Sequence, residues 1–251
     1  GVVKGKADPI DFFERDKDDV PTGYVGTSAA IFYTISQLGL IEKKSILEGA
    51  DEVLDLFRSQ GITTVYDAGV TIGLEGEAFA AISELEKENK LTSRISASAA
   101  FAQRPMHIDS AKEAMTKYGK MYNSELFRIS TLKIHGDGDW GGYTVGMLEP
   151  FDTKPDSLGM VSFPDQNQLN NLMLEAARQG YDLHVHMGGD RTARMVLDGF
   201  ESVRKAGFKD VRLTTGHTTL VDPEDIPRFK EHDLIVNTFA TEISVDHPGW
   251  R

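Results

Sequence analysis

Residues Tyr181–Glu201 read YDLHVHMGGDRTARMVLDGFE and decide the fold class. An alternating apolar run ends in His-Val-His, two glycines and an aspartate follow, and an amphipathic helical pattern begins. Side chains of a strand alternate between its two faces, so His184 and His186 point the same way. A single histidine in a strand is usually a core or surface residue. Two imidazoles at the carboxyl end of a barrel strand would instead lie where metals and substrates bind.

The same strand-then-helix pattern repeats along the chain. Strand-like runs begin at Gly61, Arg94, Phe127, Tyr181, Val211 and Asp233, and helical patterns begin at Glu77, Asp109, Pro164, Arg191 and Asp222, the last with Pro223 in its first turn. Strands that alternate with helices imply parallel βαβ units, either in an open doubly wound sheet or in a (β/α)8 barrel. No G-x-G-x-x-G motif follows an early strand, so a dinucleotide-binding sheet has no support.

Polar residues gather where several of these strands end, which favours the barrel. They are Asp67, the segment 133–137, His184, His186, His217 and Thr238. The carboxyl ends of all barrel strands converge on one site. Six strands are recognisable where a barrel needs eight, so we expect the α/β fold of a partial (β/α)8 TIM barrel over residues 61–251. We expect residues 1–60 to form a loop and two helices that pack on the barrel, all within a single catalytic domain.

Composition narrows the function classes. The 251 residues are 40% hydrophobic and 26% charged, with a formal net charge of −12. This acidic balance argues against nucleic-acid binding and against an anionic membrane surface, because both need basic patches. No apolar run reaches the about 18 residues of a membrane span, and we expect a cytoplasmic protein. The chain contains no cysteine, so His, Asp, Glu or a modified Lys must hold any metal.

Neighbouring strand ends carry groups that could form a metal centre. Lys133 lies in an apolar run, where a lysine is rare unless it forms a salt bridge or is modified. His184 and His186 end the next strand, and His217 follows a glycine that lets other groups approach closely. Asp67 ends an earlier strand. Three histidines in helical or loop contexts are expected to be structural or solvated: His107, His232 and His247.

A resemblance to a known family rests on five segments. They are PTGYV (21–25), GITTVYDAGV (61–70), LKIHGDGDWGGYTVGMLEPF (132–151), LHVHMGGDRTARMVLDGFE (183–201) and GHTTLVDPEDIPRFKE (216–231). The chain resembles amidohydrolase family 3, the YtcJ-like branch of the metal-dependent amidohydrolase superfamily, which includes N-substituted formamide deformylase. The resemblance implies a centre in which a carboxylated lysine bridges two cations and neutral imidazoles complete the coordination. It places Lys133, His186 and His217 in the ligand positions and leaves His184 as a neighbour on the same face.

Several features of that family have no match here. The H-x-H of its first strand and the aspartate of its eighth strand have no counterpart, so we expect the flanking strands to lie before Gly1 and after Arg251 of a longer chain. Gly216 replaces the glutamate that precedes the last histidine ligand, and Met187-Gly188 replaces Ala-Ile. Asp-Gly-Asp-Trp at 137–140 replaces small residues. These differences surround the expected substrate pocket, so the resemblance does not identify the substrate.

The leading hypothesis is a metal-dependent amidohydrolase that hydrolyses an amide-type C–N bond of a small molecule. The resemblance implies one or two zinc ions in the full-length protein, Lys133, His186 and His217 as catalytic residues and metal ligands, and a homodimer. Two alternatives stay open: a Schiff-base enzyme of class I aldolase type that uses Lys133, and a barrel without catalysis. This chain alone is expected to be inactive.

If this chain is part of a longer protein, as expected, its structure should have the following features. We expect the side chains of Lys133, His186 and His217 to converge, with the rings of His186 and His217 less than about 10 Å apart, because zinc–nitrogen bonds are about 2 Å long. Lys133 should be unmodified and no metal fully coordinated. The strands that begin at Gly61 and Asp233 should be open edges, which favour poor solubility or pairing with a second copy.

Overall fold

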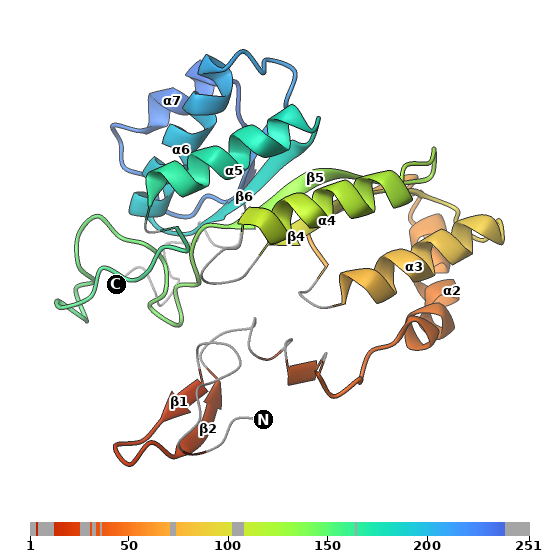
Figure 1. Cartoon of the computed structure of the whole chain (residues 1–251), viewed down its shortest axis with the longest axis horizontal. Coiled ribbons are helices and arrows are strands. Elements are labelled where there is room, and N and C mark those ends of the chain that lie inside the picture. Colours follow the sequence, from red (N-terminus) through yellow and green to blue (C-terminus); the bar gives the residue numbers. More distant parts are fainter. Residues whose placement is uncertain are drawn as a thin grey trace. The chain divides into compact units, whose positions relative to one another are not determined.

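The computed structural model describes residues 4, 13–25, 31, 34–35, 37–70, 74–101, 108–163 and 165–238 (Figure 1). The chain divides into two compact units. Unit 1 comprises residues 1–100 and 122–129, and unit 2 comprises residues 101–121 and 130–251. No helix in the described part of the chain is long and apolar enough to cross a membrane.

One sheet contains six strands in chain order: β3 (Thr64–Asp67), β4 (Arg94–Phe101), β5 (Phe127–His135), β6 (Asp182–Met187), β7 (Leu213–His217) and β8 (Ile235–Thr238). The helices between them are α3 (Glu75–Lys87), α4 (Ile108–Met121), α5 (Gln166–Arg178), α6 (Asp190–Lys205) and α7 (Ile226–Glu231). Every strand pairing described within this sheet is parallel. Parallel neighbours joined through helices are the repeat of a (β/α)8 barrel, so the predicted α/β fold with a partial barrel is confirmed.

The first part of unit 1 differs from the loop expected before residue 60. Strands β1 (Phe13–Arg15) and β2 (Pro21–Val25) pair in an antiparallel hairpin. The Asp16 carboxylate accepts hydrogen bonds from the backbone N–H groups of residues 18 and 20, and Asp19 has a φ of 60°. An aspartate that bonds the backbone two residues ahead stabilises a turn, which explains the hairpin.

The helical part of the expected N-terminal segment is described only in part. Helix α2 (Lys43–Ser59) is present as predicted. The helix expected over residues 28–39 falls largely outside the described residues. Elsewhere in unit 1, the rings of Phe79, Tyr122 and Phe127 form a cluster with centroids 5.3–6.0 Å apart.

The core of unit 2 lies between the sheet and its helices. Helices α5 and α6 lie side by side over β6 (Figure 1). The aliphatic residues of β6, Leu183, Val185 and Met187, are buried, and Phe200 of α6 is fully buried. Full burial of one such side chain stabilises the fold by roughly 1.5–3 kcal/mol. Gly199 lets the two helices approach closely, because a Cβ at this position would overlap the sulfur of Met173 on α5.

The ends of these helices follow from local sequence. The Asp165 side chain caps α5 by accepting a hydrogen bond from the N–H of Asn167. Gly180 and Gly207 follow α5 and α6 with positive φ angles of 80° and 93°, the conformation that glycine adopts after a helix. Helix α7 begins later than predicted, at Ile226, and the proline in its first turn is therefore residue 227 rather than residue 223.

Candidate metal centre

The pairing of β5 with β6 places two rows of basic side chains at the carboxyl ends of these strands. Lys133 is level with His184, and His135 is level with His186. Because residues two apart share a face, all four side chains lie on one face of the sheet, as the alternation predicts for the two histidines of β6. His135 was not assigned to the site from the sequence. Its position two residues after Lys133 was the available signal.

Lys133 is buried without a carboxylate partner in the described part of unit 2. Its side chain is only 5% exposed, and burial lowers its pKa to about 8. The sequence also allowed an ordinary salt bridge for Lys133, and no such salt bridge is present in the described part of unit 2. A pKa of about 8 leaves roughly a tenth of the amine uncharged at pH 7. The uncharged amine can act as a nucleophile, or it can be carboxylated to give a metal ligand.

Gly216 of β7 creates the space in which Lys133 and His184 meet. A Cβ at this glycine would lie 2.7 Å from Nε2 of His184 and 3.2 Å from Nζ of Lys133. Both basic groups therefore lie close to the backbone of β7, and the expectation that this glycine permits close approach is confirmed. His184 is 2% exposed, and burial, followed by the charge of Lys133, lowers its pKa to about 3. His184 is thus an uncharged imidazole at neutral pH.

His217 joins the cluster through an unusual backbone conformation. The pairing of β6 with β7 makes His217 level with Met187, so simple alternation would put its ring on the face opposite His186. Its φ is 66°, and the N–H of Thr218 donates to the carbonyl of Gly216 at 2.9 Å, the pattern of a γ-turn. The centroids of the His217 and His186 rings are nevertheless only 4.4 Å apart.

This contact fulfils the expected convergence of the two histidines. The strained turn is what turns the His217 ring towards His186, and non-glycine residues with such backbone angles are concentrated at functional sites. Burial, followed by the charge of His186, lowers the pKa of His217 to about 4. Its imidazole is therefore also uncharged at neutral pH.

His186 lies at the centre of the cluster. Its ring stacks on that of His135 with a centroid distance of 5.2 Å and an interplanar angle of 19°. Its Nε2 lies 2.7 Å from the carbonyl oxygen of Gly138 and 3.1 Å from Oδ1 of Asp137. Burial lowers the pKa of His135 well below its usual value. The rings of His135, His186 and His217 therefore form one cluster, with His186 in contact with both of the others.

Two further residues were predicted at strand ends and are not part of the cluster described above. Asp67 belongs to unit 1, where its carboxylate accepts a hydrogen bond from the N–H of Gly69 at 3.0 Å and burial raises its pKa. Thr238 ends β8, as predicted. Of the histidines expected to be structural, His232 is buried and its carbonyl accepts a hydrogen bond from Arg204. His107 and His247 lie outside the described residues.

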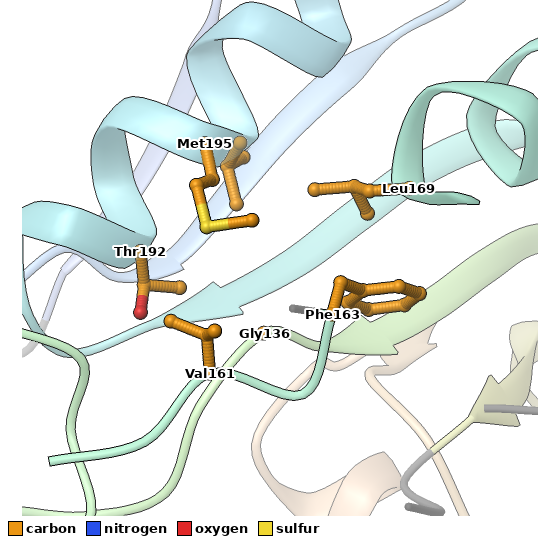
Figure 2. A pocket seen from close by; sticks show the side chains of 7 residues that line it. Gly136, Val161, Phe163, Leu169, Thr192 and Met195 are labelled. Carbon is orange, nitrogen blue, oxygen red and sulfur yellow. The ribbon is translucent and has the colours of Figure 1, made fainter. Parts of the chain in front are cut away.

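A small cavity lies on the helix side of β5 (Figure 2). Its lining is almost entirely apolar: Gly136, Val161, Phe163, Leu169, Thr192, Met195 and Val196. Thr192 supplies the single polar side chain, and none of the basic residues of the candidate centre takes part. This cavity is therefore a packing gap between α5, α6 and the loop after β5.

The donor set fits part of a divalent-cation site. Within the described ranges, no group of three or more His, Asp or Glu side chains is arranged to hold a metal ion. The rings of His186 and His217 are in contact, and the charge of Lys133 contributes to lowering the pKa of His217. Uncharged imidazole nitrogens suit zinc and related cations, and a carbamate on Lys133 would add oxygen ligands. The ligand roles of these three residues stay a prediction.

Comparisons with known proteins agree with this fold. The sequence profile of the Amidohydrolase family matches residues 4–243. Exoenzymes regulatory protein AepA of Pectobacterium carotovorum subsp. carotovorum is 26% identical over 232 residues, which are 88% of this chain and 46% of AepA. YtcJ of Bacillus subtilis (strain 168) is 28% identical over 120 residues, which are 48% of this chain and 22% of YtcJ.

A solved structure shows the same fold. The crystal structure of an uncharacterized metal-dependent hydrolase from Pyrococcus furiosus matches with a TM-score of 0.65 at 19% sequence identity. The match covers 93% of this chain and 45% of that hydrolase. The chain therefore spans less than half the length of each of these three proteins.

Proposed function

Because this chain belongs to the amidohydrolase family, we propose that the complete protein is a metal-dependent hydrolase that cleaves an amide-type C–N bond of a small molecule. The observation that carries the proposal is that Lys133, His186 and His217 lie at the carboxyl ends of three neighbouring strands, with the rings of His186 and His217 4.4 Å apart. Active sites of (β/α)8 barrels lie at this end of the strands.

Lys133, His186 and His217 would hold the cation, for which zinc is the best candidate. A divalent cation supplies Lewis-acid chemistry, because it polarises a carbonyl group and makes water more acidic. His217 is suited to this role because its pKa of about 4 leaves the imidazole lone pair free of a proton at neutral pH. His217 therefore does not need to lose a proton before it can bind.

Lys133 has the properties that carboxylation requires. The uncharged amine attacks carbon dioxide, a C–N bond forms, and one proton is released to give a carbamate. Because burial lowers the pKa of Lys133 to about 8, the reactive amine is present near neutral pH. The resulting anion would have His184 beside it and would lie on the same face as His186.

Metal content tests this function directly. The complete protein should contain a divalent metal by elemental analysis, and Lys133→Ala and His217→Ala should each lower the stoichiometry. His232→Ala is the matched control, because it removes a buried imidazole of unit 2 that lies outside the cluster. Unchanged metal content in both Lys133→Ala and His217→Ala would refute the ligand assignment.

A Schiff-base enzyme is the second candidate, favoured by the buried Lys133 with its lowered pKa. In that chemistry the lysine amine attacks a substrate carbonyl, and water leaves to form an imine. Borohydride would then trap a carbonyl substrate on Lys133, which is detected as a mass increase of the peptide that contains it. The hydrolase proposal predicts no trapped adduct.

A further inference from the structure

The carboxylate of Asp137 is one of the most enclosed polar groups next to the candidate centre. Its side chain has no exposed surface. Oδ1 accepts a hydrogen bond from the N–H of Gly188 at 2.9 Å, and Oδ2 accepts from the N–H groups of Gly189 and Gly146, each at 3.0 Å. The same Oδ1 lies 3.1 Å from Nε2 of His186. Asp137 thus joins the loop after β5, the start of α6 and one histidine of the centre.

Gly188 and Gly189, the two glycines of the MGGD segment at 187–190, make this close packing possible. A Cβ on Gly188 would lie 2.5 Å from the side chain of Val145, and a Cβ on Gly189 would overlap the carbonyl of Gly146. Only glycine therefore lets residues 145–146 lie against the turn between β6 and α6. The first N–H groups of a helix have no partner within the helix, and the Asp137 carboxylate supplies one.

The surroundings of Nε2 on His186 determine where its proton lies. This nitrogen faces two oxygens, the carbonyl of Gly138 at 2.7 Å and the carboxylate of Asp137 at 3.1 Å. Both oxygens accept hydrogen bonds and neither can donate one, so the nitrogen between them must carry a proton, which in a singly protonated ring is the only one. The lone pair is then on Nδ1.

We propose that Asp137 is a positioning residue that holds His186 in its Nε2–H tautomer and leaves Nδ1 as the nitrogen available to a cation. The metal-binding part of this inference rests on the proposed function, whereas the tautomer does not. A carboxylate behind a ligating histidine fixes the ring and raises its basicity, and losing such a group typically weakens metal affinity about 10- to 100-fold.

Asp190 provides a matched control. Its Oδ1 accepts hydrogen bonds from the N–H groups of Leu148 and Arg191, each at 2.8 Å. It therefore also ties the loop after β5 to the start of α6, but no contact between Asp190 and an imidazole is described. Asp190→Asn should perturb the loop without touching His186, and Asp137→Asn should perturb both.

The experiment uses the complete, metal-free protein with 15N-labelled histidine. Two-bond proton–nitrogen correlation spectra identify the ring tautomers, and the His186 signals are assigned by their loss in His186→Gln. We expect the Nε2–H tautomer in the native protein and in Asp137→Asn a population with the proton on Nδ1, because the amide can donate to Nε2. Zinc affinity, measured by competition with a chromophoric chelator, should fall about 10- to 100-fold in Asp137→Asn and less than about threefold in Asp190→Asn.

Separate outcomes identify separate failures. A proton on Nδ1 of His186 in the native protein would overturn the proposed role of Asp137, and this measurement needs no variant to fold. Equal losses of zinc affinity in Asp137→Asn and Asp190→Asn would also overturn it, because both would then act only through the loop. A native protein with the Nε2–H tautomer that binds no divalent cation would instead refute the proposed function.

Discussion

Gly216→Ala should destabilise the protein through one contact, with the imidazole of His184. The added Cβ would lie 2.7 Å from Nε2 of His184 and 3.2 Å from Nζ of Lys133. The lysine amine ends a flexible chain and can move by a few tenths of an ångström. The His184 ring is rigid and 2% exposed, so it must rotate or push on its neighbours. Such overpacking typically costs about 1–3 kcal/mol of unfolding free energy.

Chemical denaturation of the metal-free protein measures this loss of unfolding free energy. Two further variants test whether it comes from the contact with His184. Gly49→Ala is the control: this glycine lies inside α2 and no atom of the described residues lies within 4 Å of its missing Cβ, so alanine should raise stability by about 0.5–1 kcal/mol. The double variant Gly216→Ala with His184→Ala should cost at least about 1 kcal/mol less than the sum of the single variants, because the ring is then absent. Additive costs in this cycle would refute the steric explanation.

Three other perturbations have expected outcomes. Lys133→Met should raise the unfolding free energy of the metal-free protein at pH 7 by up to about 3 kcal/mol, because the folded-state pKa of about 8 lies below the normal 10.5. The native protein should accordingly gain stability as pH rises from about 8 to 10.5, and Lys133→Met should lose that slope in a denaturation series. His217 has a folded-state pKa of about 4, so the native protein should lose stability as pH falls from about 6.5 to 4, and His217→Gln should show a shallower loss in the same assay. Ile235 and Val236 are exposed on β8, so the chain on its own should associate, and Ile235→Lys should shift it towards monomer in size-exclusion chromatography.

The sequence predicted the sheet well because its strands and helices follow different periodicities. Strand starts near Gly61, Arg94 and Phe127 and the alternation around His184 all match the structure. The hairpin before residue 60 was missed, although the aspartates of the turn between β1 and β2 are a typical turn signal. Short strands with few apolar residues produce little periodicity, which is why the signal was overlooked.

The geometry of the site was less accessible to sequence reasoning. The convergence of Lys133 and His186 follows from strand register, but alternation alone would have placed His217 on the opposite face. A positive φ at a non-glycine residue depends on tertiary contacts and has no reliable sequence signal. The link from Asp137 to His186 joins residues 49 positions apart, so no local pattern could reveal it. The division of the chain at residue 60 and the homodimer stay predictions.

The enclosed carboxylate of Asp137 also limits which substrates can use the start of α6. Helix N-termini in many enzymes bind the phosphate or carboxylate of a substrate through their free N–H groups and the helix dipole. Here the N–H groups of Gly188 and Gly189 already donate to Asp137, and the added negative charge would repel a second anion. The proposed hydrolase would therefore have to bind an anionic group of its substrate through donors other than the N–H groups of Gly188 and Gly189.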